Sequence, residues 1–292
     1  MKQSYFDKLF EKIKFRVMKK KTIKDIKGVK FVSYGENYFF YIYELSDELK
    51  VYLRDFLPNI CHGDNEAEIG DTIHSYSETL KEFLRRYEAK RQNQQIGLIG
   101  ELMLHFLTRL YLDNFQVCSP FFNMEDGSVK KGFDIILRDV KDDKTVWFVE
   151  SKAGEYGSED KDSTDSLMRR FDIAYADLKS RLNDNQRQLW LNALNSARVA
   201  MIDDRDEKKQ VIEILRAYSN NVAKEELTSQ ECSVILAATL FHDVTQKVDY
   251  TVMENKELEV RKKAVFKNAI LIGIQKSTYS RIVDFLKSEA GK

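Results

Sequence analysis

The stretch that decides the fold reads Val146-Trp147-Phe148-Val149-Glu150-Ser151-Lys152. Four apolar residues, two of them β-branched and two aromatic, predict a buried strand. Side chains alternate along a strand, so the acid and the lysine at its end point to the same face. Unpaired charges at such a position are costly, which implies that Glu150 and Lys152 are paired, neutralised or bound to a metal.

A second strand with an acid at its start lies directly upstream. It covers 133–138 and carries Asp134 directly after Gly132-Phe133, and the polar turn 140–144 joins it to the first strand. An antiparallel hairpin of these two strands brings Asp134 beside Glu150. One cleft can then hold two carboxylates and an ammonium group.

An almost wholly apolar helix is predicted over 96–112, before a short strand at 115–118. Glu101 interrupts it within the run Gly97-Leu98-Ile99-Gly100-Glu101. A buried acid here could join the two carboxylates, or it could satisfy Arg109, Lys152 or a backbone group.

Downstream, an amphipathic helix is marked by apolar residues at helical spacing: Leu167, Phe171, Ala174, Leu178 and Leu182. A further helix includes 211–222. The apolar runs 233–241 and 269–274 are typical of strands buried on both faces, and 277–287 predicts a closing helix. The order indicates an α/β (α+β) fold, a mixed sheet flanked by helices.

The first ninety residues form a separate predicted region of α+β character. A hairpin is expected over 29–45, a polar loop over 59–77 and a charged helix over 75–92. We therefore predict a boundary near residue 92, with an N-terminal region 1–92 that binds a partner or regulates and a main domain 93–292. Residues 1–30 carry eleven Lys or Arg against three acids; they could contact nucleic acid or form a solvated face of a folded segment.

Composition excludes several classes of protein. The 292 residues hold 47 Lys+Arg and 47 Asp+Glu, so no global positive field supports nonspecific phosphate binding. No apolar run is long enough for a membrane span, and no secretory signal is recognisable, which predicts a cytoplasmic protein. The three cysteines are too few for a disulfide framework and are expected to be buried thiols. The four histidines show no zinc-ligand spacing, and no phosphate-binding loop for ATP is present.

The predicted cluster of acids suits metal-dependent phosphodiester chemistry. Asp134 and Glu150 are hard oxygen ligands for Mg²⁺ or Mn²⁺, and Glu101 could bind the same ion directly or through water. The metal would activate a water and offset charge on the phosphate, while Lys152 would orient or deprotonate that water.

The tripeptide alone is weak evidence, because an acid followed two residues later by Lys begins at ten other positions, Asp177 among them. The preceding strand, the Asp-bearing strand and the acid-bearing helix distinguish Glu150. The plain alternative is a salt-bridged strand end in an unrelated sheet. Lys130 and Lys131 could contact phosphate or be merely solvated, and Arg169 with Arg170 could line a groove for nucleic acid or be a helix surface pair.

Gly132-Phe133-Asp134, Glu150-Ser151-Lys152 and the helical Glu101 resemble the PD-(D/E)xK nuclease superfamily over roughly residues 93–292. Phe133 stands where that motif has Pro. The Gly-x-x-Gly-Glu helix and the N-terminal region make the chain similar, more narrowly, to the HamA nuclease subunits of Hachiman anti-phage systems. The resemblance implies a restriction-endonuclease-like fold and a metal-dependent DNase that a helicase partner restrains until phage DNA is sensed.

The sequence thus favours a Mg²⁺- or Mn²⁺-dependent DNA endonuclease with catalytic residues Glu101, Asp134, Glu150 and Lys152. Two alternatives stay open. One is a non-catalytic subunit that binds a partner through a nuclease-like scaffold; the other is an RNA-directed nuclease of the same fold, because groove width and pocket shape decide between RNA and DNA.

Overall fold

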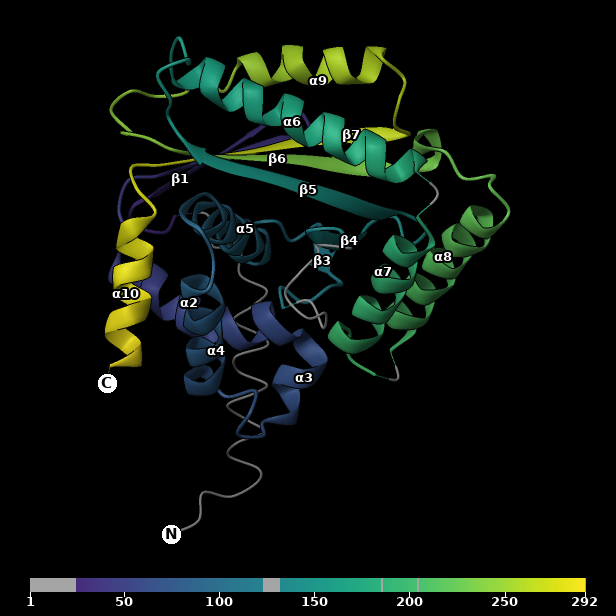
Figure 1. The fold of residues 1–292 in the computed structure, drawn as a ribbon, viewed down its shortest axis with the longest axis horizontal. Coiled ribbons are helices and arrows are strands. Elements are labelled where there is room, and N and C mark those ends of the chain that lie inside the picture. The colour runs from purple at the N-terminus through teal and green to yellow at the C-terminus, as the bar shows by residue number, and fades with distance from the viewer. Residues whose placement is uncertain (1–24, 123–131, 185, 204, 292) are drawn as a thin grey trace.

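A computed structural model of the chain describes residues 25–122, 132–184, 186–203 and 205–291 (Figure 1). The basic residues up to Lys24, and Lys130 with Lys131, lie outside this described part, as do the predictions made for them.

The described residues form a seven-stranded sheet with the order β1-β2-β7-β6-β5-β4-β3. The pairs β2–β7, β7–β6 and β6–β5 are parallel, and the remaining pairs β1–β2, β5–β4 and β4–β3 are antiparallel. The mixed sheet predicted from the sequence is therefore confirmed. In chain order the strands are β1 (Val29–Tyr34), β2 (Asn37–Ile42), β3 (Phe115–Val117), β4 (Ile135–Asp139), β5 (Val146–Glu155), β6 (Ser233–Phe241) and β7 (Asn268–Lys276).

Helices cover both faces of this sheet (Figure 1). On one face α5 (Gln92–Tyr111) packs with α2 (Asp47–His62), α4 (Tyr76–Glu88) and α10 (Ser280–Ala290). The opposite face carries α6 (Ser163–Asn183), α7 (Arg187–Ala200), α8 (Asp206–Ala223) and α9 (Val252–Lys262). We call these the α5 face and the α6 face.

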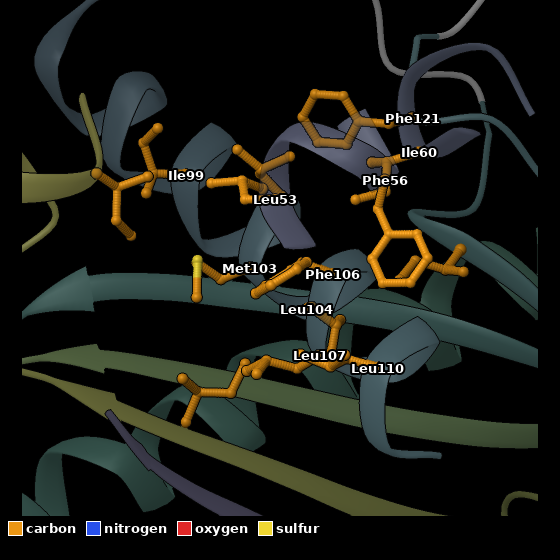
Figure 2. Packing of buried hydrophobic residues seen from close by; sticks show 14 of the residues in the cluster. Leu53, Phe56, Ile60, Ile99, Met103, Leu104, Phe106, Leu107, Leu110 and Phe121 are labelled. Carbon is orange, nitrogen blue, oxygen red and sulfur yellow. The ribbon is translucent and has the colours of Figure 1, made fainter. Parts of the chain in front are cut away.

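The central strands are apolar on both sides because both sides are covered. Every residue of β6 is buried. Ile235 and Ala237 belong to the core on the α5 face, whereas Val234, Leu236 and Ala238 belong to the core on the α6 face. Burial on both sides explains why this strand is a continuous apolar run without polar alternation. Figure 2 shows side chains of α2 and α5 packed together in the core on the α5 face.

Gly100 lets α5 approach the sheet closely. A Cβ atom at this position would overlap the Cβ of Ala153 on β5, whereas a Cβ at Gly97 would meet nothing within 4 Å. The close approach fixes where α5 crosses β5, just beyond Lys152. The second glycine of the Gly-x-x-Gly-Glu run is therefore required by packing.

The N-terminal hairpin belongs to the same sheet as the rest of the chain. Strand β2 pairs with β7, and the buried Asn37 side chain accepts a hydrogen bond from the Leu271 backbone N–H at 2.8 Å and donates one to Glu257 at 2.6 Å. The predicted boundary near residue 92 lies between α4 and α5. The division into two regions stays a prediction, but strands from both sides of that boundary share one sheet.

Most predicted elements are confirmed, including all of β6, the N-terminal hairpin and the helices α4, α5, α6, α8 and α10. The loop predicted over 59–77 is wrong in its first part, because α2 continues to His62 and 64–69 forms the short helix α3 (Asp64–Ile69). Gly63 and Gly70 bracket α3 with positive φ angles, so they end helices here without making a long loop. The three cysteines are free and buried, as expected.

Within the described residues, the helices that are long enough to cross a bilayer are not apolar enough to do so.

Candidate active site

Asp134 lies at the point where β4 joins β5. The antiparallel register sets Ile135 opposite Val149, so Asp134 comes across from Glu150. The Asp134 backbone N–H donates to the Val149 carbonyl at 3.2 Å. The hairpin predicted from the sequence therefore forms, and it brings the two acids to neighbouring positions.

The carboxylate of Asp134 replaces a strand partner where the two strands separate. Pairing of β4 with β5 ends at Val149, but β5 continues to Glu155. Beyond the last pair, Asp134 Oδ2 accepts a hydrogen bond from the Ser151 backbone N–H at 2.7 Å. Only 4% of Asp134 is exposed, and hydrogen bonding to the charged form is what stabilises a carboxylate under such burial.

Glu150 and Lys152 lie on the α6 face of β5. Ala153, on the alternate side of the strand, contacts α5, so the two even-numbered side chains point the other way. Lys152 Nζ lies 3.0 Å from Glu150 Oε1. Glu150 is 3% exposed, whereas the Lys152 side chain keeps 28% of its surface exposed. The lysine therefore reaches from the buried acid toward solvent.

Helix α6 supplies two further charged groups, Asp177 and Arg181, one turn apart on the same helix face. Asp177 Oδ2 lies 2.5 Å from Lys152 Nζ. Arg181 donates through Nη1 to Glu150 Oε2 and through Nη2 to the carbonyl of Gly132. We call Asp134, Glu150, Lys152, Asp177 and Arg181 the charge cluster.

Burial and a neighbouring negative charge raise the pKa of Glu150. Burial is the largest cause that raises its pKa to about 7, and the negative charge of Asp134 raises it further, while Arg181 and Lys152 oppose the rise. A carboxyl group with a pKa this high is a feature of functional sites, although structural ion pairs also produce such shifts. The influence of Asp134 places the two acids within electrostatic reach of each other.

For Lys152, the charged neighbours outweigh the effect of burial on the pKa. Burial alone lowers its pKa, but the negative charges and hydrogen bonds of Glu150 and Asp177 outweigh burial and raise the pKa above its usual value. The lysine is therefore protonated at neutral pH. In this arrangement it can orient a water or stabilise negative charge, but it cannot take a proton from water.

Glu101 stands on the other side of the sheet. It is 6% exposed and follows Gly100, the residue that contacts Ala153 on the α5 face. One turn further along α5, His105 Nε2 donates to the carbonyl of Asp134 at 3.3 Å, because a carbonyl oxygen can only accept. The structure thus brings Asp134, Glu150 and Lys152 together and places Glu101 on the helix behind them. Arg109, weighed as a partner of Glu101, forms an ion pair with Asp64 at 2.9 Å.

The donor chemistry of the site suits Mg²⁺, which commonly takes one or two protein carboxylates and keeps several waters. Asp134 and Glu150 supply two such carboxylates. Both oxygens of Glu150, however, are engaged by Lys152 and Arg181. Across the described ranges, no three His, Cys, Asp or Glu side chains are arranged to hold a metal ion. A metal at Glu150 would therefore bind an oxygen that already has a cationic partner.

Sequence reasoning missed Asp177 and Arg181. In the sequence, Asp177 is one of ten chance acid-x-Lys matches. The α6 residues considered for nucleic-acid binding are Arg169 and Arg170. Arg170 is buried and donates to the Glu155 and Ser166 carbonyls, each at 2.6 Å, so for this residue the surface-pair interpretation is wrong. The available signal was helical spacing, because Asp177 and Arg181 each precede a core leucine of α6.

The fold and the charge cluster define an α/β protein in which a buried acid and a partly exposed lysine lie in the middle of β5, where β4 separates from it. Residues 8–290 match the family model HamA, and the chain belongs to the HamA family. This assignment indicates a protein related to Hachiman defence. Among curated proteins the sequence has no match.

Proposed function

We propose that this protein is a metal-dependent DNA endonuclease of the PD-(D/E)xK superfamily, the effector of a Hachiman complex that a helicase partner regulates. The observation that carries the proposal is the meeting of Asp134, Glu150 and Lys152 at the point where β4 separates from β5. Membership of the HamA family supports the defence context.

In this proposal Asp134 and Glu150 hold Mg²⁺ or Mn²⁺. Glu101 supports the ion from behind Asp134, because it lies one turn from His105, which contacts the Asp134 carbonyl. The bound metal would supply an activated water and offset charge on the scissile phosphate. Lys152 is protonated and placed by Asp177, so it orients the nucleophile and stabilises the developing negative charge. Burial, and then the negative charge of Asp134, raise the pKa of Glu150, and a divalent ion beside both acids would offset this repulsion.

Charge balance supports a need for a partner. The chain carries 47 basic and 47 acidic residues, so its nonspecific attraction to DNA is weak. A helicase subunit that binds DNA would supply the DNA affinity that the nuclease lacks. Residues 1–92 are the proposed regulatory or partner-binding region.

The test compares the wild type with Lys152→Ala on plasmid and linear DNA, with Mg²⁺ or Mn²⁺, alone and with any helicase encoded beside it. We expect Lys152→Ala to abolish cleavage, with a loss of at least about a hundredfold, because the charge on the phosphate loses its stabilising cation. The fold should persist, since the lysine side chain is partly exposed. Lys179→Ala, an α6 lysine outside the charge cluster, is the matched control.

The proposal fails if the wild type cuts no DNA under any of these conditions, or if Lys152→Ala cuts as well as the wild type. Cleavage of RNA alone would support the alternative of an RNA-directed nuclease with the same residues.

A non-catalytic scaffold is the second candidate, and one observation favours it. The charges of Glu150 and Lys152 are already compensated by Arg181 and Asp177, as in a purely structural ion-pair network. A scaffold would show no heat stabilisation by Mn²⁺. A working metal site raises the melting temperature of the wild type with Mn²⁺ but not that of Asp134→Ala.

A further inference from the structure

Glu150 is held between two cations that come from different parts of the fold. Lys152, on the same strand, faces Oε1, and Arg181, from α6, binds Oε2. The lysine also pairs with Asp177, so its charge is shared between two acids. Among the described contacts, Arg181 pairs with no acid other than Glu150.

Arg181 is fixed in this position by three separate contacts. Besides Glu150, its guanidinium donates to the Gly132 carbonyl, and it lies 5.6 Å from the centre of the Phe133 ring. Gly132 and Phe133 directly precede Asp134. The guanidinium therefore joins the segment just before β4 to Glu150 in the middle of β5, next to both residues that carry the two carboxylates.

A divalent ion held by Asp134 and Glu150 would need this same region. A divalent ion at Glu150 would add to the two positive charges that this buried carboxylate already faces, and like charges repel strongly where little water screens them. Arg181 also satisfies the hydrogen-bonding needs of Glu150 that a metal would otherwise meet.

We infer that Arg181 is a built-in cation of the site, and that a divalent metal binds Glu150 only by displacing the Arg181 guanidinium. The inference rests on the proposed function. It makes the position of α6 a control on the metal site, because Asp177 and Arg181 move with that helix. A partner or DNA that shifted α6 would release Glu150 and leave Lys152 without Asp177.

Direct binding of Mn²⁺ to the full chain tests this inference without a cleavage assay. Free Mn²⁺ is measured by electron paramagnetic resonance for the wild type, Arg181→Gln and Arg169→Gln, each with and without Glu150→Gln. We expect Arg181→Gln to bind Mn²⁺ at least tenfold more tightly than the wild type. Arg169→Gln removes the same charge from the same helix but outside the charge cluster, where Arg169 pairs with Asp160 and Glu159, and should match the wild type.

Equal or weaker binding by Arg181→Gln, when wild-type binding depends on Glu150, overturns the inference and leaves the proposed function standing. Absence of Glu150-dependent binding in every variant overturns both the inference and the proposed metal site. If Arg181→Gln does not fold, Arg181→Lys decides, because a lysine keeps the charge but cannot contact Glu150 and Gly132 together. Its Mn²⁺ affinity should exceed that of the wild type, and an affinity no higher than that of the wild type overturns the inference.

Discussion

The two faces of β5 carry opposite kinds of residue within a few positions. On the α5 face, Ala153 touches Gly100 in a contact so close that no side chain fits between helix and strand. On the α6 face, Glu150 and Lys152 meet Asp177 and Arg181 in a network of ion pairs. The first contact depends on shape and the second on charge.

The contact on the α5 face holds β5 in place, whereas the charged side chains on the α6 face are the ones that can take part in chemistry. Close packing has one solution, because a well-packed interior resists a change of even one methylene group. Ion pairs can exchange one cation for another while the backbone stays in place. The strand can therefore be held from one side while its charged side chains change partners on the other.

The largest expected effect comes from filling the contact on the α5 face. Gly100→Ala should lower the free energy of unfolding by about 2 to 3 kcal/mol, because the new methyl group overlaps Ala153 and must push α5 from β5. Urea unfolding measures the change. A loss below about 0.5 kcal/mol would mean that α5 adjusts freely, and the contrast between the two faces would disappear.

A smaller effect should appear as a pH dependence on the α6 face. The pKa of Glu150 is raised to about 7 from its ordinary value of 4.5, so the folded state binds more protons than the unfolded state between these values. This group therefore favours folding at low pH, and its contribution is lost as pH rises from about 4.5 to 7. Relative to the wild type, Glu150→Gln should gain about 2 kcal/mol of stability between pH 5 and pH 8, from about 1.4 kcal/mol per pKa unit.

The comparison of variant with wild type cancels other titrating groups. His62 has a pKa lowered to about 4, first by burial, and its contribution to stability rises with pH over a similar range. Unfolding free energies of both proteins at pH 5, 6, 7 and 8 give the difference. A difference that does not change with pH would show that Glu150 is fully ionised in the folded protein at pH 5, so that its ion pairs outweigh burial.

The smallest effect is expected at Gly97, three residues before Gly100 on the same helix. A Cβ there meets nothing within 4 Å. Gly97→Ala should raise the free energy of unfolding by about 0.5 to 1 kcal/mol, because alanine restricts the unfolded chain and favours helix. The two glycine variants, measured side by side, separate helix propensity from contact with β5. Destabilisation by Gly97→Ala would contradict the assigned orientation of α5.

The sheet was largely predictable because its strands have strong local signals. The run 233–241 is apolar throughout and matches β6 at both ends, since both faces of the strand are covered. Helix α3 was missed because Asp64–Ile69 is polar and short, and no residue in it is buried to impose a helical period. Its structure depends on the two glycines at its ends more than on its own side chains.

For the candidate site, sequence could predict the pairing within one hairpin but not across the sheet. Asp134 and Glu150 follow from the register of two neighbouring strands. Arg181 is 31 residues from Glu150, on a helix whose angle to the sheet depends on packing with β5 and β6. Helical spacing places Asp177 and Arg181 on one face of α6, but it does not predict which strand residues that face contacts.

The pairing of β2 with β7 sets the time at which the protein can become complete. The Asn37 side chain accepts a hydrogen bond from Leu271, 234 residues later in the chain, and the ribosome makes the chain from its N-terminus. The hairpin β1–β2 cannot enter the sheet until β7 has been synthesised, so the sheet is completed only after the strands and helices between them have been made. A product that terminates before β7 lacks the strand that joins the hairpin to the rest of the sheet.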